Sequence, residues 1–184
     1  MPEADPLLLK AARRGDETSF RALYLRYRTP LFRFAWRLTG SLPAAEDIIQ
    51  ECFLALLEGA SFDADRGSLR AYLFGITRNL ALKRLRIAER ESEEMEETEA
   101  ALDPLQDLLS VERSEAVARA VAALPFRQRE ALVLFEYEDL SLDEIAQVTG
   151  TEIGAIKARL HRAREALRRR LAQLVASRAE TRCS

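Results

Sequence analysis

Residues 139 to 170 constrain the fold most, because they predict two short helices separated by one glycine. Ser141 is followed three residues later by Glu144, the capping-box spacing in which a hydroxyl and a carboxylate satisfy free N–H groups at a helix start. Gly150 then breaks the helix, and Thr151 is placed to cap the next one. The stretch therefore predicts a helix-turn-helix.

The second of these helices combines an apolar stripe with a basic remainder. Its apolar residues recur at steps of three or four, which places them on one side of a helix: Ile153, Ile156, Leu160, Ala163, Leu167, Leu171 and Leu174. From 152 to 171 there are seven Lys or Arg against two acids. A basic face is often only solvated, but together with both caps and the two-helix spacing it favours DNA binding.

The rest of the chain also predicts helices. Alternating β-branched segments are absent, and the 184 residues include only seven glycines, which is typical of an all-α protein. Periodicity, caps and breakers place helices at about 5–13, 17–39, 43–58, 69–89 and 126–137, with another that opens at Asp103-Pro104 and ends before Pro125. Pro30 is expected to kink the second of them.

Charge divides the chain into three parts that the net charge of -2 conceals. Residues 1–90 carry 15 bases and 11 acids, residues 91–112 carry nine acids and no base, and residues 113–184 carry 13 bases and ten acids. A block of like charges with little apolar content resists packing. We therefore expect two small helical domains joined by an acidic linker: a domain over 1–90, the linker over 91–107, a domain over 108–175 that ends in the helix-turn-helix, and a disordered tail over 176–184.

Other classes of protein find little support. Cys52 and Cys183 suggest neither a disulfide framework nor a metal site, and His161 lacks the partners of a ligand set or a catalytic dyad. Phosphate loops and nucleophile–base pairs are also missing, so we expect no enzyme and no cofactor. No apolar run approaches 18 residues and no signal segment opens the chain, so we expect a cytoplasmic protein without membrane insertion.

Two segments of the first domain carry candidate functional residues. Residues 44–57 gather acids opposite an apolar stripe, which a solvated face explains equally well. Residues 62–86 place Tyr72 and Phe74 just upstream of several cations, an arrangement suited to stacking on unpaired bases beside a phosphate track. For Tyr72 a position in the apolar core is the more frequent explanation.

The order of these motifs resembles a bacterial sigma factor of the extracytoplasmic-function (ECF) group over nearly the whole chain. The matching strings are AEDIIQECF, FD-x-x-RGS-x-x-AYL-x-x-ITRN, the acidic segment, LP-x-x-x-R, EIA and GAIKARLHRAR. The resemblance implies two helical domains without enzymatic activity. It also implies three partners: core RNA polymerase, promoter DNA and an anti-sigma protein.

The resemblance assigns roles to individual residues. Asp47, Gln50 and Glu51 match the helix that holds the clamp helices of the largest polymerase subunit. The stretch that engages the minus-ten element, next to a loop that captures a flipped base, is matched by Arg70, Tyr72, Arg78, Asn79, Lys83 and Arg86. The helix that reads the minus-thirty-five element is matched by Glu152, Ala155, Lys157, Arg159 and Arg162.

Two departures and one alternative accompany this interpretation. Lys83 stands where an aspartate is frequent in the group, and Ala155 and Ala158 where hydroxyl residues are frequent, so the motif does not reveal the promoter sequence. The alternative is an autonomous transcriptional regulator, in which the second domain alone binds an operator as part of a dimer. Residues 1–90 show no pattern of a ligand cavity with convergent polar groups, which disfavours it.

Overall fold

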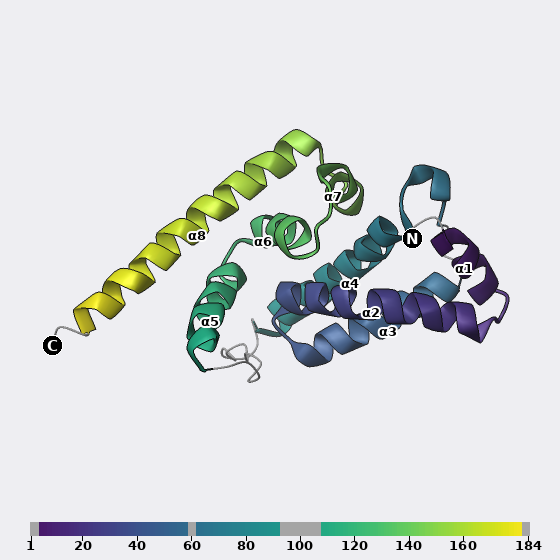
Figure 1. The fold of residues 1–184 in the computed structure, drawn as a ribbon, viewed down its shortest axis with the longest axis horizontal. Helices are drawn as coiled ribbons and strands as arrows, with labels where there is room; N and C mark the ends of the chain where they lie inside the picture. Colours follow the sequence, from purple (N-terminus) through teal and green to yellow (C-terminus); the bar gives the residue numbers. More distant parts are fainter. Residues whose placement is uncertain (1–3, 59–61, 93–107, 182–184) are drawn as a thin grey trace.

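The computed structural model describes residues 4–58, 62–92 and 108–181, and these fold into helices and connecting turns (Figure 1). The first group of elements is α1 (Asp5–Ala12), α2 (Glu17–Thr39), α3 (Leu42–Leu57), the 3-10 turn η2 (Ala64–Arg66) and α4 (Leu69–Ser92). The second is α5 (Leu108–Ala122), α6 (Phe126–Leu132), the π-helical turn η3 (Val133–Tyr137), α7 (Leu142–Thr149) and α8 (Ile153–Thr181). The all-α prediction is confirmed.

Local capping chemistry sets most of the helix ends. Asp16 caps α2 by accepting from the Ser19 N–H at 3.2 Å, and Gly40 ends it in the left-handed region at φ 71°. Pro30 lies inside α2, which continues through it. Ser41 caps α3, so that helix begins at Leu42, one residue before the predicted start.

The helix-turn-helix forms with one correction. The capping box between Ser141 and Glu144 is present, and Gly150 ends α7 at φ 63°. Thr151 does not cap α8: its hydroxyl donates to the Thr149 carbonyl at 3.3 Å, and Glu152 supplies the carbonyl that accepts from the Ile156 N–H. Glu152 thus stands directly before the first turn of α8.

Two other segments depart from the predictions. The helix predicted over 126–137 changes after Leu132 into a π-helical turn, where the Glu138 N–H donates to the Val133 carbonyl five residues back. Residues 176–181 belong to α8 instead of a disordered tail, because neither Gly nor Pro interrupts this stretch of helix-forming residues. Residues 91 and 92 belong to α4, while the remaining linker residues 93–107 and the predicted start at Asp103-Pro104 lie outside the described residues.

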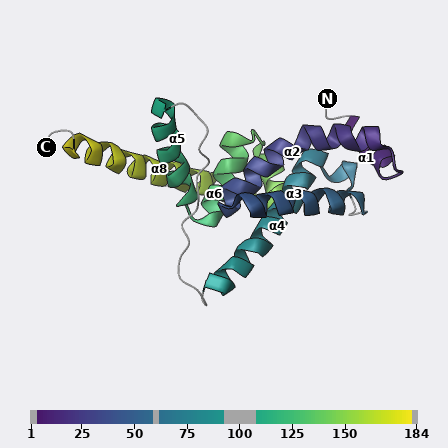
Figure 2. The ribbon, with the colours of Figure 1, turned by 90° about the horizontal axis from the view of Figure 1, so that it is seen from below.

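The two groups pack against each other. In the first, α2 contacts α1, α3 and α4, and in the second, α8 contacts α5, α6 and α7. The second group rests on the first where α7 meets α4 and where α6 and η3 meet α2, and the buried apolar residues form one cluster that runs through both. Figure 1 shows the far half of α8 extending beyond this body, and Figure 2 shows the end of α4 projecting from it.

Candidate nucleic-acid interface

The start of α8 presents the residues assigned to the minus-thirty-five element. The apolar side of the helix packs inward, so its opposite side faces solvent. Glu152, Ala155, Lys157 and Arg162 are exposed there. Arg159 is half-buried, and its Nη1 donates to the Thr151 hydroxyl at 3.2 Å. The predicted set therefore forms one surface, with Arg159 held at its edge.

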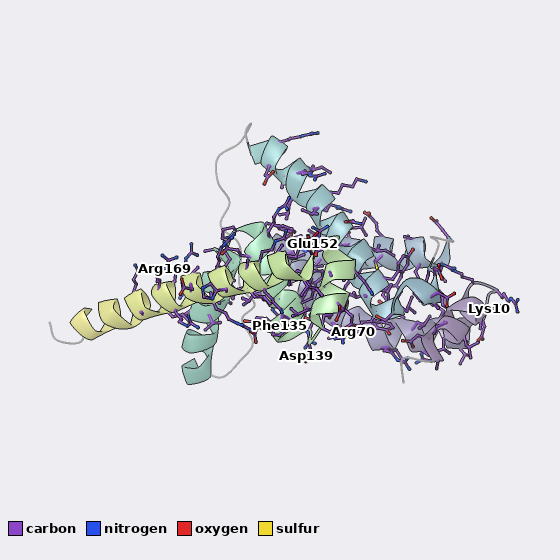
Figure 3. All side chains as sticks on the ribbon, turned by 90° about the horizontal axis from the view of Figure 1, so that it is seen from above. Lys10, Arg70, Phe135, Asp139, Glu152 and Arg169 are labelled. Atoms are coloured by element: carbon purple, nitrogen blue, oxygen red, sulfur yellow. The ribbon has the colours of Figure 1, made fainter. Side chains whose placement is uncertain are left out.

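Further along α8 the cations divide between two roles. Arg164 donates to the Glu136 carboxylate at 2.6 Å and lies 5.5 Å from the centre of the Phe135 ring. Arg170 donates to the Ala120 carbonyl at 3.5 Å. These two arginines bind α8 to its own domain, while the exposed side continues to Arg169 (Figure 3).

The acidic side of α3 is exposed but carries a counter-ion. Asp47 and Gln50 are exposed and Glu51 is partly so. Arg84 of α4 donates to the Asp47 carboxylate at 3.1 Å and to that of Glu51 as well. The three predicted polymerase-binding residues therefore share one helix face, which continues to an exposed Leu54.

A cleft of about 370 Å³ opens beside α4, where base capture is predicted. Phe62 and Tyr72 line it with ring centroids 5.5 Å apart, and Asn79 lies at its wall. Tyr72 is half-buried, so it is neither a fully buried core residue nor a fully exposed stacking residue. Burial raises the pKa of its hydroxyl. Gln147 and Val148 of α7 also line the cleft, so the second domain covers part of it.

Arg78, a minus-ten candidate, is bound to the second domain. Its Nε donates to Oε1 of Glu130 on α6, whose side chain is 0% exposed. The other oxygen, Glu130 Oε2, is buried without a hydrogen-bond partner among the described residues. A buried carboxylate with only one of its two oxygens hydrogen-bonded costs free energy. This contact therefore joins the domains but is less stabilising than a fully hydrogen-bonded ion pair.

Arg70, a second minus-ten candidate, is also hydrogen-bonded to the second domain. It donates to the backbone carbonyl of Glu138, whose carboxylate lies 3.8 Å from Arg37 of α2. Figure 3 shows Arg70 at the junction beside Asp139. Ser68 adds a bond of 3.3 Å to the capping carboxylate of Glu144. The second domain therefore occupies the face of α4 that the resemblance assigns to DNA.

The other minus-ten candidates are free of this contact. Asn79, Lys83 and Arg86 are exposed along the rest of α4, which leaves the body of the molecule in Figure 2. The structure thus places Arg70, Tyr72 and Arg78 against the second domain and leaves Asn79, Lys83 and Arg86 to solvent. Sequence reasoning missed Arg84, Glu130 and Glu138; the position of Glu130 among buried apolar residues was the only local signal.

The carboxyl groups at the interface make it sensitive to pH. Burial raises the pKa of Glu130 and of Glu138 above the ordinary value, against the attraction of nearby arginines. The closed arrangement therefore binds protons more readily than an open one, and domain separation should increase as the pH rises from below to above the raised pKa of these two groups. Small-angle scattering across this range measures it. Glu130→Gln with Glu138→Gln should flatten the dependence, and opening on acidification would contradict it.

Three further features of the described residues concern metal binding, the buried cysteine and the length of the apolar helices. No group of three His, Cys, Asp or Glu side chains there could hold a metal ion. Cys52 is buried with its Sγ 3.5 Å from the Thr77 hydroxyl, and burial raises the pKa of the thiol to about 11. Within the described ranges, every helix is too short or too polar to span a bilayer.

Comparison with known proteins assigns the family. The family description "Sigma-70 region 2" matches residues 23–91, and "Sigma-70, region 4" matches residues 114–167. The ECF RNA polymerase sigma factor SigW of Bacillus subtilis is 30% identical over 180 residues, which cover 90% of this chain and 96% of SigW. The chain belongs to the ECF sigma factors.

Solved structures agree with this assignment for both groups of helices. The sigma factor RpoE of Bartonella quintana, in complex with the anti-sigma factor NepR, matches with a TM-score of 0.72 at 30% identity, over 83% of this chain and 96% of RpoE. CnrH, in complex with the cytosolic domain of CnrY, matches with a TM-score of 0.69 at 28% identity, over 92% of this chain and 98% of CnrH. This ECF sigma factor is an initiation factor that directs RNA polymerase to promoters, not an autonomous regulator.

Proposed function

We propose that three faces of this sigma factor divide the work of initiation. Asp47, Gln50 and Glu51 on α3 bind core RNA polymerase. The face of α4 from Arg70 to Arg86 binds the minus-ten element, with the Phe62–Tyr72 cleft receiving an unpaired base. Glu152, Ala155, Lys157, Arg159 and Arg162 on α8 read the minus-thirty-five element. The factor has no catalytic activity of its own and acts in the cytoplasm.

The separation of the acidic face of α3 from the basic face of α8 is the observation that carries the proposal. An exposed acidic helix face suits a cationic protein surface and repels DNA, whereas the start of α8 is exposed, basic and free of the domain contact. A factor that must bind a protein and a duplex at once needs two such surfaces. Each lies on a different domain.

Promoter-directed transcription tests this function. The full chain and core polymerase are incubated with templates that carry randomised upstream sequence. We expect transcripts that start at a fixed distance from a shared pair of elements, and none with core polymerase alone. A dimer that binds a palindromic site tightly without polymerase would contradict the proposal.

Minus-ten recognition requires the two domains to separate. Arg70 and Arg78 cannot reach DNA while Glu138 and Glu130 hold them, and Gln147 covers part of the cleft. We propose that an anti-sigma partner binds this closed arrangement. The support is that RpoE was solved with an anti-sigma factor and resembles this chain over 83% of its length. Affinity capture from the native host should recover core polymerase and one such inhibitor as separate complexes.

Substitution of Lys157 and of Arg162 tests the recognition helix. If either side chain reads a base, its replacement by alanine should weaken minus-thirty-five binding by about 1–3 kcal/mol and relax specificity at one position. If it meets only phosphate, the loss should be uniform across sequences and the salt slope should fall by about 1. Arg168→Ala, on an exposed later turn of α8, is the matched control and should change sequence preference little.

A further inference from the structure

The end of α1 carries three exposed cations that none of the proposed faces uses: Lys10, Arg13 and Arg14. Neither Lys10 nor Arg14 forms an ion pair with a carboxylate in the part of the chain that the structure describes. Figure 3 shows Lys10 pointing away from the body, at the end opposite to Arg169 of α8. Arg13 differs, because its Nε donates to the Leu56 carbonyl at 3.0 Å and so joins α1 to the end of α3.

These cations line a second cleft that adjoins the base-capture cleft. The second cleft, of about 350 Å³, lies between α1 and η2 and is lined by Lys10, Arg13, Arg14, Phe62 and three further residues. Phe62 belongs to both clefts and packs against Tyr72 in the first. Burial raises the pKa of the Tyr72 hydroxyl, and the positive charge of Arg13 opposes this rise, as expected for a guanidinium close to that ring. A path of cations and aromatic rings therefore runs from α4 across Phe62 to the end of α1.

A simpler explanation covers only part of this arrangement. Basic residues are common in the last turn of a helix, where they offset its dipole, and Lys10 fits that role. The dipole does not account for a cleft that shares the lining residue Phe62 with the neighbouring cleft. Asp63, an exposed acid of the neighbouring loop, accepts from the Asp65 N–H at 3.0 Å and forms no ion pair with Lys10 or Arg14 in the described structure.

We infer that Lys10, Arg13 and Arg14 bind the phosphates of the single DNA strand whose base enters the Phe62–Tyr72 cleft. Sites for single strands combine stacking rings with a basic track along the backbone, and both parts are present here. The inference rests on the proposed function and extends it to nucleotides beside the captured base. Arg13, which lies nearest the rings, is held by its bond to the Leu56 carbonyl. Lys10 and Arg14 can move with the DNA backbone.

The double variant Lys10→Ala, Arg14→Ala tests this site in the full chain with core polymerase. The probe is a forked template with the promoter selected above, unpaired from the minus-ten element onward. Each phosphate contact to a single strand contributes about 0.7 to the salt slope, so losing two should lower the slope by about 1.4, with several-fold weaker binding. Arg13 is retained because it joins α1 to α3.

Two further variants make the result specific. Arg21→Ala with Arg28→Ala removes the same charge from α2 and should leave the slope unchanged, as should the charge-keeping pair Lys10→Arg, Arg14→Lys. An unchanged slope in the double alanine variant overturns the inference, as does a loss of core-polymerase binding instead, which would make the partner a protein surface. If the wild-type chain fails to start transcription at any promoter, the proposed function itself fails.

Discussion

Replacing Asp47, Gln50 and Glu51 together with alanine is expected to weaken binding of this sigma factor to core RNA polymerase by about 30-fold or more. Central contact residues at protein interfaces often cost about 2 kcal/mol or more when truncated, and three on one helix face leave little of the surface intact. Titration of labelled core polymerase with the full-length factor measures the affinity. Promoter-directed transcription should fall with it, while binding of duplex minus-thirty-five DNA should not.

Charge and folding controls keep this result interpretable. Glu17→Ala with Asp143→Ala removes two exposed acids, the number that the triple variant removes, from helices other than α3 and should leave polymerase binding nearly unchanged. Arg84→Ala frees the Asp47 and Glu51 carboxylates without deleting them, so it should not reproduce the loss. If the triple variant loses polymerase and DNA binding together, unfolding explains the result better than a lost contact.

Local signals in the sequence were sufficient for most of the helices. Ser141 and Glu144 predict a helix start because their interaction spans three residues, and Gly40 and Gly150 end helices through their own backbone freedom. The bounds 17–39 of α2 followed from such signals alone. The start of α8 could not be predicted in this way, because Thr151 and Glu152 are both placed to cap the helix. The Thr151 hydroxyl bonds to the Thr149 carbonyl instead.

Contacts between distant residues could not be predicted in the same way. Arg84 lies 37 residues from Asp47 in sequence, and Arg78 lies 52 residues from Glu130. A single sequence says that these groups are charged but not which of them meet. The candidate residues on α4 were therefore identified by motif, whereas the fact that the second domain covers Arg70, Tyr72 and Arg78 required the structure.

Replacing Arg78 with alanine is expected to open the two domains without unfolding either. Removing one partner of a buried ion pair typically costs about 3–5 kcal/mol, because the remaining charge stays buried without a counter-ion. Here the chain has a less costly response, since Glu130 reaches water as soon as α6 and α7 leave α4. Small-angle scattering should show a larger radius, and hydrogen exchange should rise in α4 and α7 but not in the centres of α2 and α3.

The double variant Arg78→Ala, Glu130→Leu separates this mechanism from a loss of packing. Leucine at position 130 needs no counter-ion, and replacing both members of a buried pair with apolar residues is often neutral or stabilising. The double variant should therefore close again, although it lacks the same arginine. An open double variant would show that Arg78 holds the domains by contact area, not by charge. A closed single variant would show that α4 and α7 pack firmly without the ion pair, so promoter DNA would have to displace apolar contacts to reach Arg70 and the Tyr72 cleft.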